Sequence, residues 1–405
     1  MRLGTSLRTC PAADTAARCR LLAWPLGIAR LTDISALDTL GLPVFVSLRP
    51  EGRTARLHAG KGLSADEAET GALMEAFECA VAERASVRGP YTRLSLGALA
   101  ARLPAGLSLA DFAPRLGAAL DAYRPTLAVR CDDLMSRHHP LLPAELVMVP
   151  APDEGELPPL FGWSSNGLAS GNTLQEATLH ALLEVLERDT VAMSAVRGRA
   201  APVDLCTLPE AFAARATRWQ SLGVQLFVRQ LDGDFGLPCF EATLYAPGQP
   251  AAELARGWGL HFDRQVALAR AVSEAAQSRL CRIHSGQADA APFYGSRIGA
   301  DSAAATQARE RFRASLEREP AAGVDFGTLP HIEHRSIRAA LRDLLARLRE
   351  RGLHHAFRHR MRDDAAAAAG LHVVKVVVPR CETILGEGRR AGPRLLAEAV
   401  ARTLP

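Results

Sequence analysis

Apolar and polar positions follow the same order three times along the chain: a short apolar run, a glycine-bearing loop and then a helical pattern. The runs have the length and β-rich composition of strands, and they are residues 44–48, 146–149 and 240–245. Helix starts follow at Ser64, Thr173 and Asp263, and the first two have a glutamate three residues later, which is the pattern of a capping box. The chain therefore predicts one strand–loop–helix unit used three times.

The three predicted helices also match residue by residue, at offsets of 109 and then 90 positions. Two glutamates and an alanine recur, with a glutamine replacing the second glutamate in the third helix. The matched positions are Ala68, Glu75 and Glu78, then Ala177, Glu184 and Glu187, then Ala267, Glu274 and Gln277. The spacing is too wide and uneven for a solenoid, so the units are expected to share one domain.

Further elements complete the predicted fold. Helices are expected at 210–218, 336–351 and 389–401 and strands at 224–229 and 371–378, while 363–369 is a short connection or a helix end. Strands and helices in this order predict an α/β fold of the α+β type.

Composition narrows the class of protein. The chain has 405 residues, of which 48% are apolar and 23% charged, as in globular proteins. It has no apolar stretch long enough for a membrane span, and its net charge of +4 comes without a basic patch that would bind nucleic acid. The eight cysteines lack zinc-site or redox spacing, which favours reduced thiols and a cytoplasmic location.

The repeated glutamates are unusual because their helices are apolar nearly all round. Glu184 and Glu187 share one face of a helix whose other positions are leucine and valine, so both carboxylates are expected to be enclosed. Enclosed carboxylates are costly unless they are paired or bound to a metal, and Mg²⁺ combines carboxylates with phosphate oxygens. The alternative is a set of structural salt bridges within each helix, Glu184 with Arg188 and Glu274 with Arg270.

The loops before the first two helices fit a phosphate ligand. Gly171 and Asn172 precede a helix N-terminus, where backbone N–H groups attract anions, and Lys61 lies between two glycines in the corresponding loop. Neither loop has the P-loop pattern, and the chain has no dinucleotide-binding G-x-G-x-x-G after a strand and no G-x-S-x-G.

Three blocks of the sequence resemble the signature blocks of the YcaO family: GKGLSADEAETGALMEAFE, SSNGLASGNTLQEATLHALLEVLERD and GWGLHFDRQVALARAVSEAAQSR. The resemblance covers about residues 25–400, which implies a single YcaO domain over 25–405 after an N-terminal extension, 1–24. It also implies mixed sheets packed by helices around a central ATP site, and an ATP- and Mg²⁺-dependent enzyme that phosphorylates a peptide-backbone amide.

The same resemblance assigns site residues. The expected magnesium ligands are Glu75, Glu78, Glu184, Glu187 and Glu274, and the residues expected to hold the nucleotide are Asn172, Glu176, Arg188 and Arg270, with Lys61 added from its loop. The sequence departs from the family at Gly71, where serine is common, and at residues 379–382, where Pro-Arg-Cys-Glu replaces Pro-Gly-Leu-Glu.

The leading functional hypothesis is thioamide formation on a precursor peptide or protein, with a TfuA-like partner that handles sulfur. The opening LGIARL…GLPVFVSLRP resembles that subgroup, and the C-terminus lacks the Pro-x-Pro-x-Pro of azoline-forming members. The alternatives are an azoline-forming cyclodehydratase and an inactive subunit that presents a peptide. A homodimer is a further candidate assembly.

Overall fold

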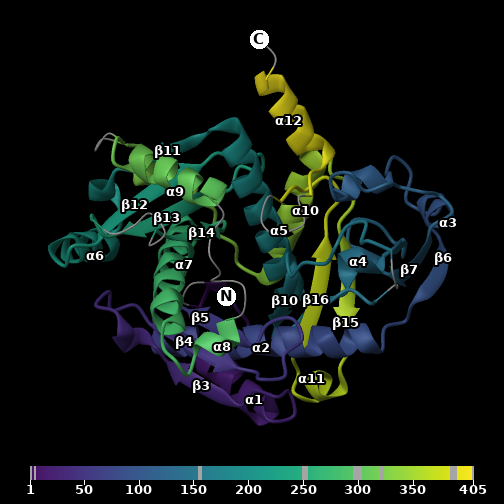
Figure 1. Cartoon of the computed structure of the whole chain (residues 1–405), viewed down its shortest axis with the longest axis horizontal. Coiled ribbons are helices and arrows are strands. Elements are labelled where there is room, and N and C mark those ends of the chain that lie inside the picture. The colour runs from purple at the N-terminus through teal and green to yellow at the C-terminus, as the bar shows by residue number, and fades with distance from the viewer. Residues whose placement is uncertain are drawn as a thin grey trace.

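Three long helices, one from each repeated unit, organise the fold: α2 (Ala65–Val87), α5 (Leu174–Arg197) and α7 (Arg264–Ser285). The structure is a computed structural model, and it describes residues 2–3, 6–153, 157–248, 254–294, 303–319, 323–383 and 390–403. Helices and antiparallel sheets alternate around the three long helices, so the predicted mixed fold of α+β type is confirmed (Figure 1).

The strands form small sheets. Their orders are β1-β2, β3-β4-β5, β6-β7-β9, β10-β16-β15-β8 and β11-β12-β13-β14, and every pair is antiparallel. The bounds are β1 Arg2–Leu3, β2 Ser6–Leu7, β3 Arg30–Asp33, β4 Val44–Leu48, β5 Leu57–Lys61, β6 Thr92–Ser95, β7 Pro125–Arg130, β8 Asp132–Asp133, β9 Leu141–Pro143, β10 Leu168–Gly171, β11 Ala200–Pro202, β12 Gln225–Leu231, β13 Cys239–Tyr245, β14 Ala255–Leu260, β15 Phe357–Met361 and β16 His372–Val377.

The other helices are shorter. Their bounds are α1 Ala12–Ala23, α3 Leu96–Ala100, α4 Ala144–Val147, α6 Glu210–Ser221, α8 Ala291–Tyr294, α9 Ala303–Leu316, α10 Ile337–Glu350, α11 Asp364–Ala368 and α12 Pro393–Thr403. The predicted elements α6, β12, α10, β16 and α12 are confirmed, and 363–369 contains the short helix α11. No helix among the described residues is both long and apolar enough to cross a bilayer.

The strand of each repeated unit differs from the prediction. The strands that lead directly into the long helices are β5, β10 and β14, whereas 44–48 and 240–245 form the preceding strands β4 and β13. The strand predicted at 146–149 is wrong, because Ala144–Val147 is the short helix α4, with Pro143 at its N-cap. A short buried apolar run is compatible with a strand or with a helix, so its pattern alone does not distinguish the two.

Glycine in these strands explains why the pattern missed them. A Cβ on Gly60 would lie 1.9 Å from the backbone oxygen of Ala68, and one on Gly259 would lie 2.1 Å from the oxygen of Ala267. The same crossing occurs in the second unit, where a Cβ on Gly171 would lie 2.6 Å from the nitrogen of Ala177. Each helix therefore crosses its own strand so closely that only glycine fits, at the alanine that recurs in all three helices.

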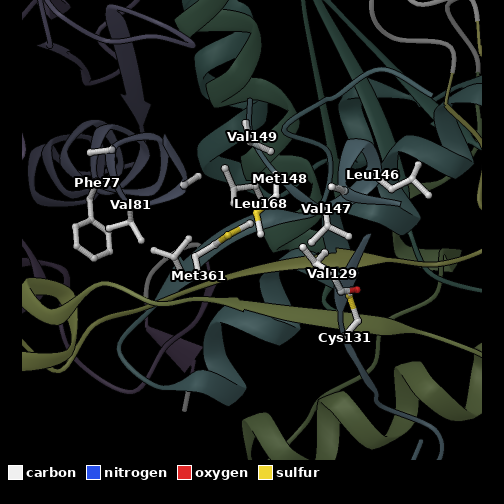
Figure 2. Packing of buried hydrophobic residues seen from close by; sticks show 14 of the residues in the cluster. Phe77, Val81, Val129, Cys131, Leu146, Val147, Met148, Val149, Leu168 and Met361 are labelled. Atoms are coloured by element: carbon white, nitrogen blue, oxygen red, sulfur yellow. Dashed lines mark hydrogen bonds between the residues drawn. The ribbon is translucent and has the colours of Figure 1, made fainter. Parts of the chain in front are cut away.

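Three hydrophobic clusters surround the long helices. Phe77 and Val81 of α2 belong to one cluster with Val129 of β7 and Met361 of β15, as Figure 2 shows. A second cluster joins α5 to β16 and α10, and a third joins α7 to β12 and β13. The N-terminal helix α1 packs against α2 and adds Cys19 to the first cluster. Each long helix is thus fixed to the strands and helices around it by apolar packing, which sets the position of its polar face.

Candidate active site

The polar faces of α2, α5 and α7 line one cavity of 840 Å³. All five glutamates predicted as metal ligands line it, and so do four of the residues predicted to hold the nucleotide. The lining includes Glu75, Glu78, Glu184, Glu187, Glu274, Lys61, Asn172, Arg188 and Arg270. In Figure 1 the helices α2, α5 and α7 lie around the middle of the molecule. The repeat therefore brings together side chains that are up to 213 residues apart in sequence.

The N-cap side chains at the starts of these helices bind as the sequence predicts, but the glutamate half of the predicted capping box does not form, since Glu67 accepts from the N–H of Leu63 at 2.9 Å and Glu176 binds Thr9 and Asn172. Ser64 Oγ accepts a hydrogen bond from the N–H of Glu67, and Thr173 Oγ1 accepts one from the N–H of Glu176. Asp263 accepts from the N–H groups of residues 265 and 266. The three helix starts are therefore fixed by their own first turns, and each helix presents its glutamates from a defined position.

Each long helix is bonded to the strand of the next unit by the side chain at the second repeated position. Glu78 of α2 accepts from the N–H and the hydroxyl of Ser170, at 2.8 and 2.6 Å. Glu187 of α5 accepts from the N–H of Leu260 at 3.0 Å. In the third helix the matched residue is Gln277, whose amide donates to the oxygen of Ala59 at 2.7 Å. The three units are thus linked in a ring, and a glutamine occurs where the partner is a carbonyl oxygen.

Basic side chains around the glutamates form ion pairs with them. Lys61 Nζ lies 2.5 Å from a carboxylate oxygen of Glu274, and a guanidinium nitrogen of Arg270 lies 3.7 Å from Glu187. Arg188 lies 3.9 Å from Glu187 and 5.9 Å from the centre of the Trp258 ring. Neither Glu184–Arg188 nor Glu274–Arg270, the pairs that the salt-bridge alternative required, is among these ion pairs, and both glutamates line the cavity.

Burial and mutual repulsion shift the titration of these carboxyl groups. Burial, opposed by the hydrogen bonds from Ser170 and reinforced by the charges of Glu184 and Glu75, raises the pKa of Glu78 to about 8. Burial likewise raises the pKa of Glu184 to about 7. Burial would also raise the pKa of Glu274, but Lys61 and then the arginines lower it below its ordinary value. The Glu78–Glu184 side of the cavity therefore favours an additional cation.

The donor set fits Mg²⁺ that is bound together with phosphates. Among the described residues, no three histidine, cysteine or acidic side chains already converge on one point as a metal cage would require. Mg²⁺ seldom uses such a cage, because it usually takes one or two carboxylates and completes its octahedron with water and phosphate oxygens. Carboxylates on several walls of one cavity, two with raised pKa values, match that mode of binding.

The N-terminal segment forms one wall of this cavity, which the sequence analysis missed. Arg8 and Thr15 are among its lining residues. The hydroxyl of Thr15 donates to the side-chain oxygen of Asn172 at 3.0 Å, and Arg18 donates to the same oxygen. Residues 6–18 carry no repeat and no helical glutamate pair, so no local pattern of the sequence signalled their role. The domain boundary predicted at residue 24 stays a prediction.

Glu176 is the one predicted site residue outside the cavity lining. Its side chain is fully buried and accepts hydrogen bonds from the N–H and hydroxyl of Thr9, at 3.0 and 2.6 Å, and from Arg8 at 3.1 Å. It also accepts from the amide of Asn172 at 3.0 Å. The carboxylate expected to complete a capping box therefore holds the N-terminal segment and Asn172 in place instead.

Gly71 also lines the cavity, at the point where α2 crosses β5. A Cβ there would lie 3.1 Å from the Cα of Gly60, a tight contact that a serine would have to relieve by a small shift. Glycine at this position therefore eases the crossing of helix and strand and leaves the cavity wall without a hydroxyl group.

The raised pKa of Glu78 predicts a pH effect on stability. The folded protein holds this proton up to about pH 8, whereas the unfolded chain releases it near its ordinary value of 4.5. The stabilisation that protonated Glu78 gives to the fold is fully present below the pKa of the unfolded chain. It is lost as the pH rises through the pKa of about 8 in the folded protein. In metal-free protein, Glu78→Gln should therefore gain melting temperature relative to the wild type between about pH 5 and pH 8. Thermal melts of both proteins in a chelator measure this difference, with the exposed Glu51→Gln as control; a difference that stays flat with pH would contradict it.

Comparison with known proteins identifies the family. A model described as YcaO cyclodehydratase, ATP- and Mg²⁺-binding, matches residues 59–382. The chain belongs to the YcaO family, and ATP and Mg²⁺ are the ligands of that family. The resemblance seen in the three sequence blocks is thereby confirmed.

Relatives and solved structures agree with this assignment. A protein of Methanothermobacter thermautotrophicus is 30% identical over 380 residues, which are 91% of this chain and 94% of that protein. A Rhizobium leguminosarum protein encoded in the tfuA 3' region is 33% identical over 292 residues, 69% of this chain and 68% of that one. The structure of YcaO from Methanopyrus kandleri bound with AMPPCP and Mg²⁺ has a TM-score of 0.71 and 21% identity, and 97% of each chain is covered. A heterocyclase in complex with substrate and cofactor has a TM-score of 0.73 and 21% identity, with 98% of this chain and 55% of that chain covered.

Proposed function

We propose that this protein uses ATP and Mg²⁺ to phosphorylate a backbone amide of a peptide or protein, and that sulfide then replaces the phosphate to give a thioamide. The observation that carries the proposal is the single cavity in which five matched glutamates face the lysine and two arginines of facing elements. A set of carboxylates and cations lining one cavity suits a triphosphate with its metal ions.

In this proposal the glutamates Glu75, Glu78, Glu184, Glu187 and Glu274 hold Mg²⁺, which supplies charge neutralisation and alignment of the phosphates. Lys61, Arg188 and Arg270 contact phosphate oxygens, and Asn172 lies at the start of α5, whose N–H groups attract the anion. Glu176 acts through Asn172 and the N-terminal segment, because its carboxylate is fully buried against them.

The reaction balances with the amide, ATP and hydrogen sulfide as its reactants. The amide oxygen attacks the γ-phosphorus of ATP and ADP leaves, which gives a phosphorylated imidate. Sulfide then attacks the imidate carbon, the C–O bond breaks, and inorganic phosphate departs. Each turnover converts one amide, one ATP and one hydrogen sulfide into a thioamide, ADP and phosphate. The role of the protein is to position and neutralise the phosphates, since such transfers depend mainly on alignment and electrostatics.

Two observations support sulfide as the external nucleophile. The described part of the C-terminus, residues 390–403, ends in α12 (Pro393–Thr403), and the cavity-lining residues come from other parts of the chain. Arg394 holds this helix on the body of the protein through Asp189 at 2.7 Å, and the carboxylate of Glu382 accepts from backbone N–H groups at its start. The relative encoded in a tfuA 3' region supports a TfuA-like partner that delivers sulfur.

The mass of the modified peptide tests this proposal. The full chain is incubated with ATP, Mg²⁺, a peptide encoded beside its gene and a TfuA-like protein, with and without sulfide. We expect a peptide mass in which one oxygen is replaced by sulfur, only when sulfide is present. Loss of water from the peptide without sulfide would show a cyclodehydratase, which the family name and the heterocyclase fold favour as the second candidate. The absence of any ATP turnover would favour an inactive peptide-presenting subunit.

A further inference from the structure

A buried lysine outside the predicted site holds the loop that precedes β10. Lys375 lies in β16 with 3% of its surface exposed, and its ammonium donates to the backbone oxygens of Ser164 and Asn166, both at 2.5 Å. The two strands are paired here, with Leu168 opposite Lys375. The loop therefore leads into β10, and the neighbouring strand β16 carries the lysine that anchors the loop.

The anchored loop leads directly to one of the five glutamates. The N–H of Gly167 donates to the carboxylate of Glu184, and the oxygen of Gly167 accepts from the N–H of Val376 at 2.8 Å. Gly167 has φ +78°, and a Cβ on it would lie 2.3 Å from the oxygen of Val376 and 2.9 Å from the side chain of Val185. The backbone at Gly167 is thus enclosed between α5 and β16, next to Glu184.

Lys375 and Glu184 are also coupled electrostatically. Burial lowers the pKa of Lys375 to about 7, and the attraction of Glu184 opposes that fall. The chain has 48 basic residues, and only Lys61 and Lys375 are lysines. A compact ammonium with three donors can donate to both carbonyl oxygens at once. Lys61 is thus bonded to Glu274, and Lys375 lies near enough to Glu184 for their charges to interact.

We infer that Lys375 is a positioning residue for the Mg²⁺ site: it fixes the 164–167 loop so that the N–H of Gly167 orients the carboxylate of Glu184 toward the metal. The inference rests on the proposed function, in which Glu184 is a metal ligand. Groups that orient a metal ligand by hydrogen bonding to it typically contribute about 10- to 100-fold to metal affinity. Lys375 acts on Glu184 indirectly, through the loop and Gly167.

The test uses the full chain with AMPPCP as the probe. Calorimetry measures AMPPCP binding with and without Mg²⁺ in the wild type, in Lys375→Met and in His372→Met, an exposed position of the same strand. We expect Lys375→Met to lose about tenfold of the Mg²⁺-dependent gain in affinity and to change metal-free binding little. Hydrogen exchange should also become faster at the Gly167 amide in this variant, whereas His372→Met should match the wild type in both measurements.

A general loss of structure would weaken binding with and without Mg²⁺ alike, so equal losses in the two conditions would overturn the inference. Unchanged Mg²⁺ dependence and unchanged exchange at Gly167 would also overturn it. Lys375→Gln, which keeps one donor group, is measured beside Lys375→Met so that a folding defect in one variant leaves the comparison intact. If Glu184→Gln loses the Mg²⁺-dependent gain while the Lys375 variants keep it, only this inference fails; if Glu184→Gln keeps the gain, the proposed function fails.

Discussion

Glu184→Gln is expected to abolish ATP turnover while the protein keeps its fold. The glutamine has nearly the same shape but lacks the negative charge that a hard cation requires, so the loss should be about 10³-fold or more. Turnover of ATP by the purified variant measures this directly. The side chain lines the cavity beside Gly167 and is part of the pair of carboxyl groups with raised pKa values, so its charge is unfavourable in the metal-free protein.

The stability of the same variant separates a ligand from a structural role. Because burial raises the pKa of Glu184, removing the charge should leave the melting temperature of the metal-free protein at pH 8 equal to or above that of the wild type. A structural carboxylate would show the opposite, a lower melting temperature with much of the activity retained. Glu350→Gln, an exposed position of α10, is the matched control and should retain wild-type turnover and stability.

Arg188→Ala is expected to weaken nucleotide binding by about 2 to 3 kcal/mol, or about 30- to 150-fold, because a charged hydrogen bond to a phosphate would be lost. Arg188 lies among Glu184, Glu187 and Glu274, whose charges raise its pKa against the effect of burial. Its guanidinium also lies near Trp258. Calorimetry with AMPPCP and Mg²⁺ gives the affinity of the variant.

The control for this variant is Arg342→Ala, an exposed arginine of α10 that should bind AMPPCP as the wild type does. Circular dichroism should give the same spectrum for all three proteins. Equal affinity of Arg188→Ala and the wild type would remove Arg188 from the nucleotide site and would leave it as a counter-charge for Glu187, 3.9 Å away.

The repeated glutamates were predictable because helical contacts are local. A capping residue, an apolar face and a pair of side chains three residues apart are all contained in one stretch of about fifteen residues. The recurrence of the pattern then placed Glu75, Glu184 and Glu274 in equivalent positions. The structure confirms the caps and the common cavity.

The glycine-containing strands were not predictable by the same reasoning. Gly60 and Gly171 weaken the β pattern, and their role is visible only when the helix that crosses them is in place. The contacts of Thr9 with Glu176 and of Gln277 with Ala59 span 167 and 218 residues, so no local pattern contains them. The role of Lys375 was not predictable for a related reason. Its partners are backbone oxygens, which every residue type has, so the sequence of the loop does not indicate them.

The ring of contacts among the units gives the site its shape. Glu78 and Glu187 each use one carboxylate oxygen to bind the next unit, and the carboxylates still line the cavity. Gln277 closes the ring without adding a charge. The three copies of one unit therefore differ at the position where a sixth carboxylate would have added repulsion to a cavity that already holds five.

The most direct test of the account is a crystal structure of the protein with AMPPCP and Mn²⁺, which replaces Mg²⁺ and is visible by its anomalous scattering. We expect anomalous peaks inside the cavity, between the phosphates and carboxylates drawn from Glu75, Glu78, Glu184, Glu187 and Glu274, with Arg188 on the phosphate side. Peaks outside this cavity, or a nucleotide bound elsewhere with these carboxylates still paired to Lys61 and Arg270 alone, would contradict the assignment of the site.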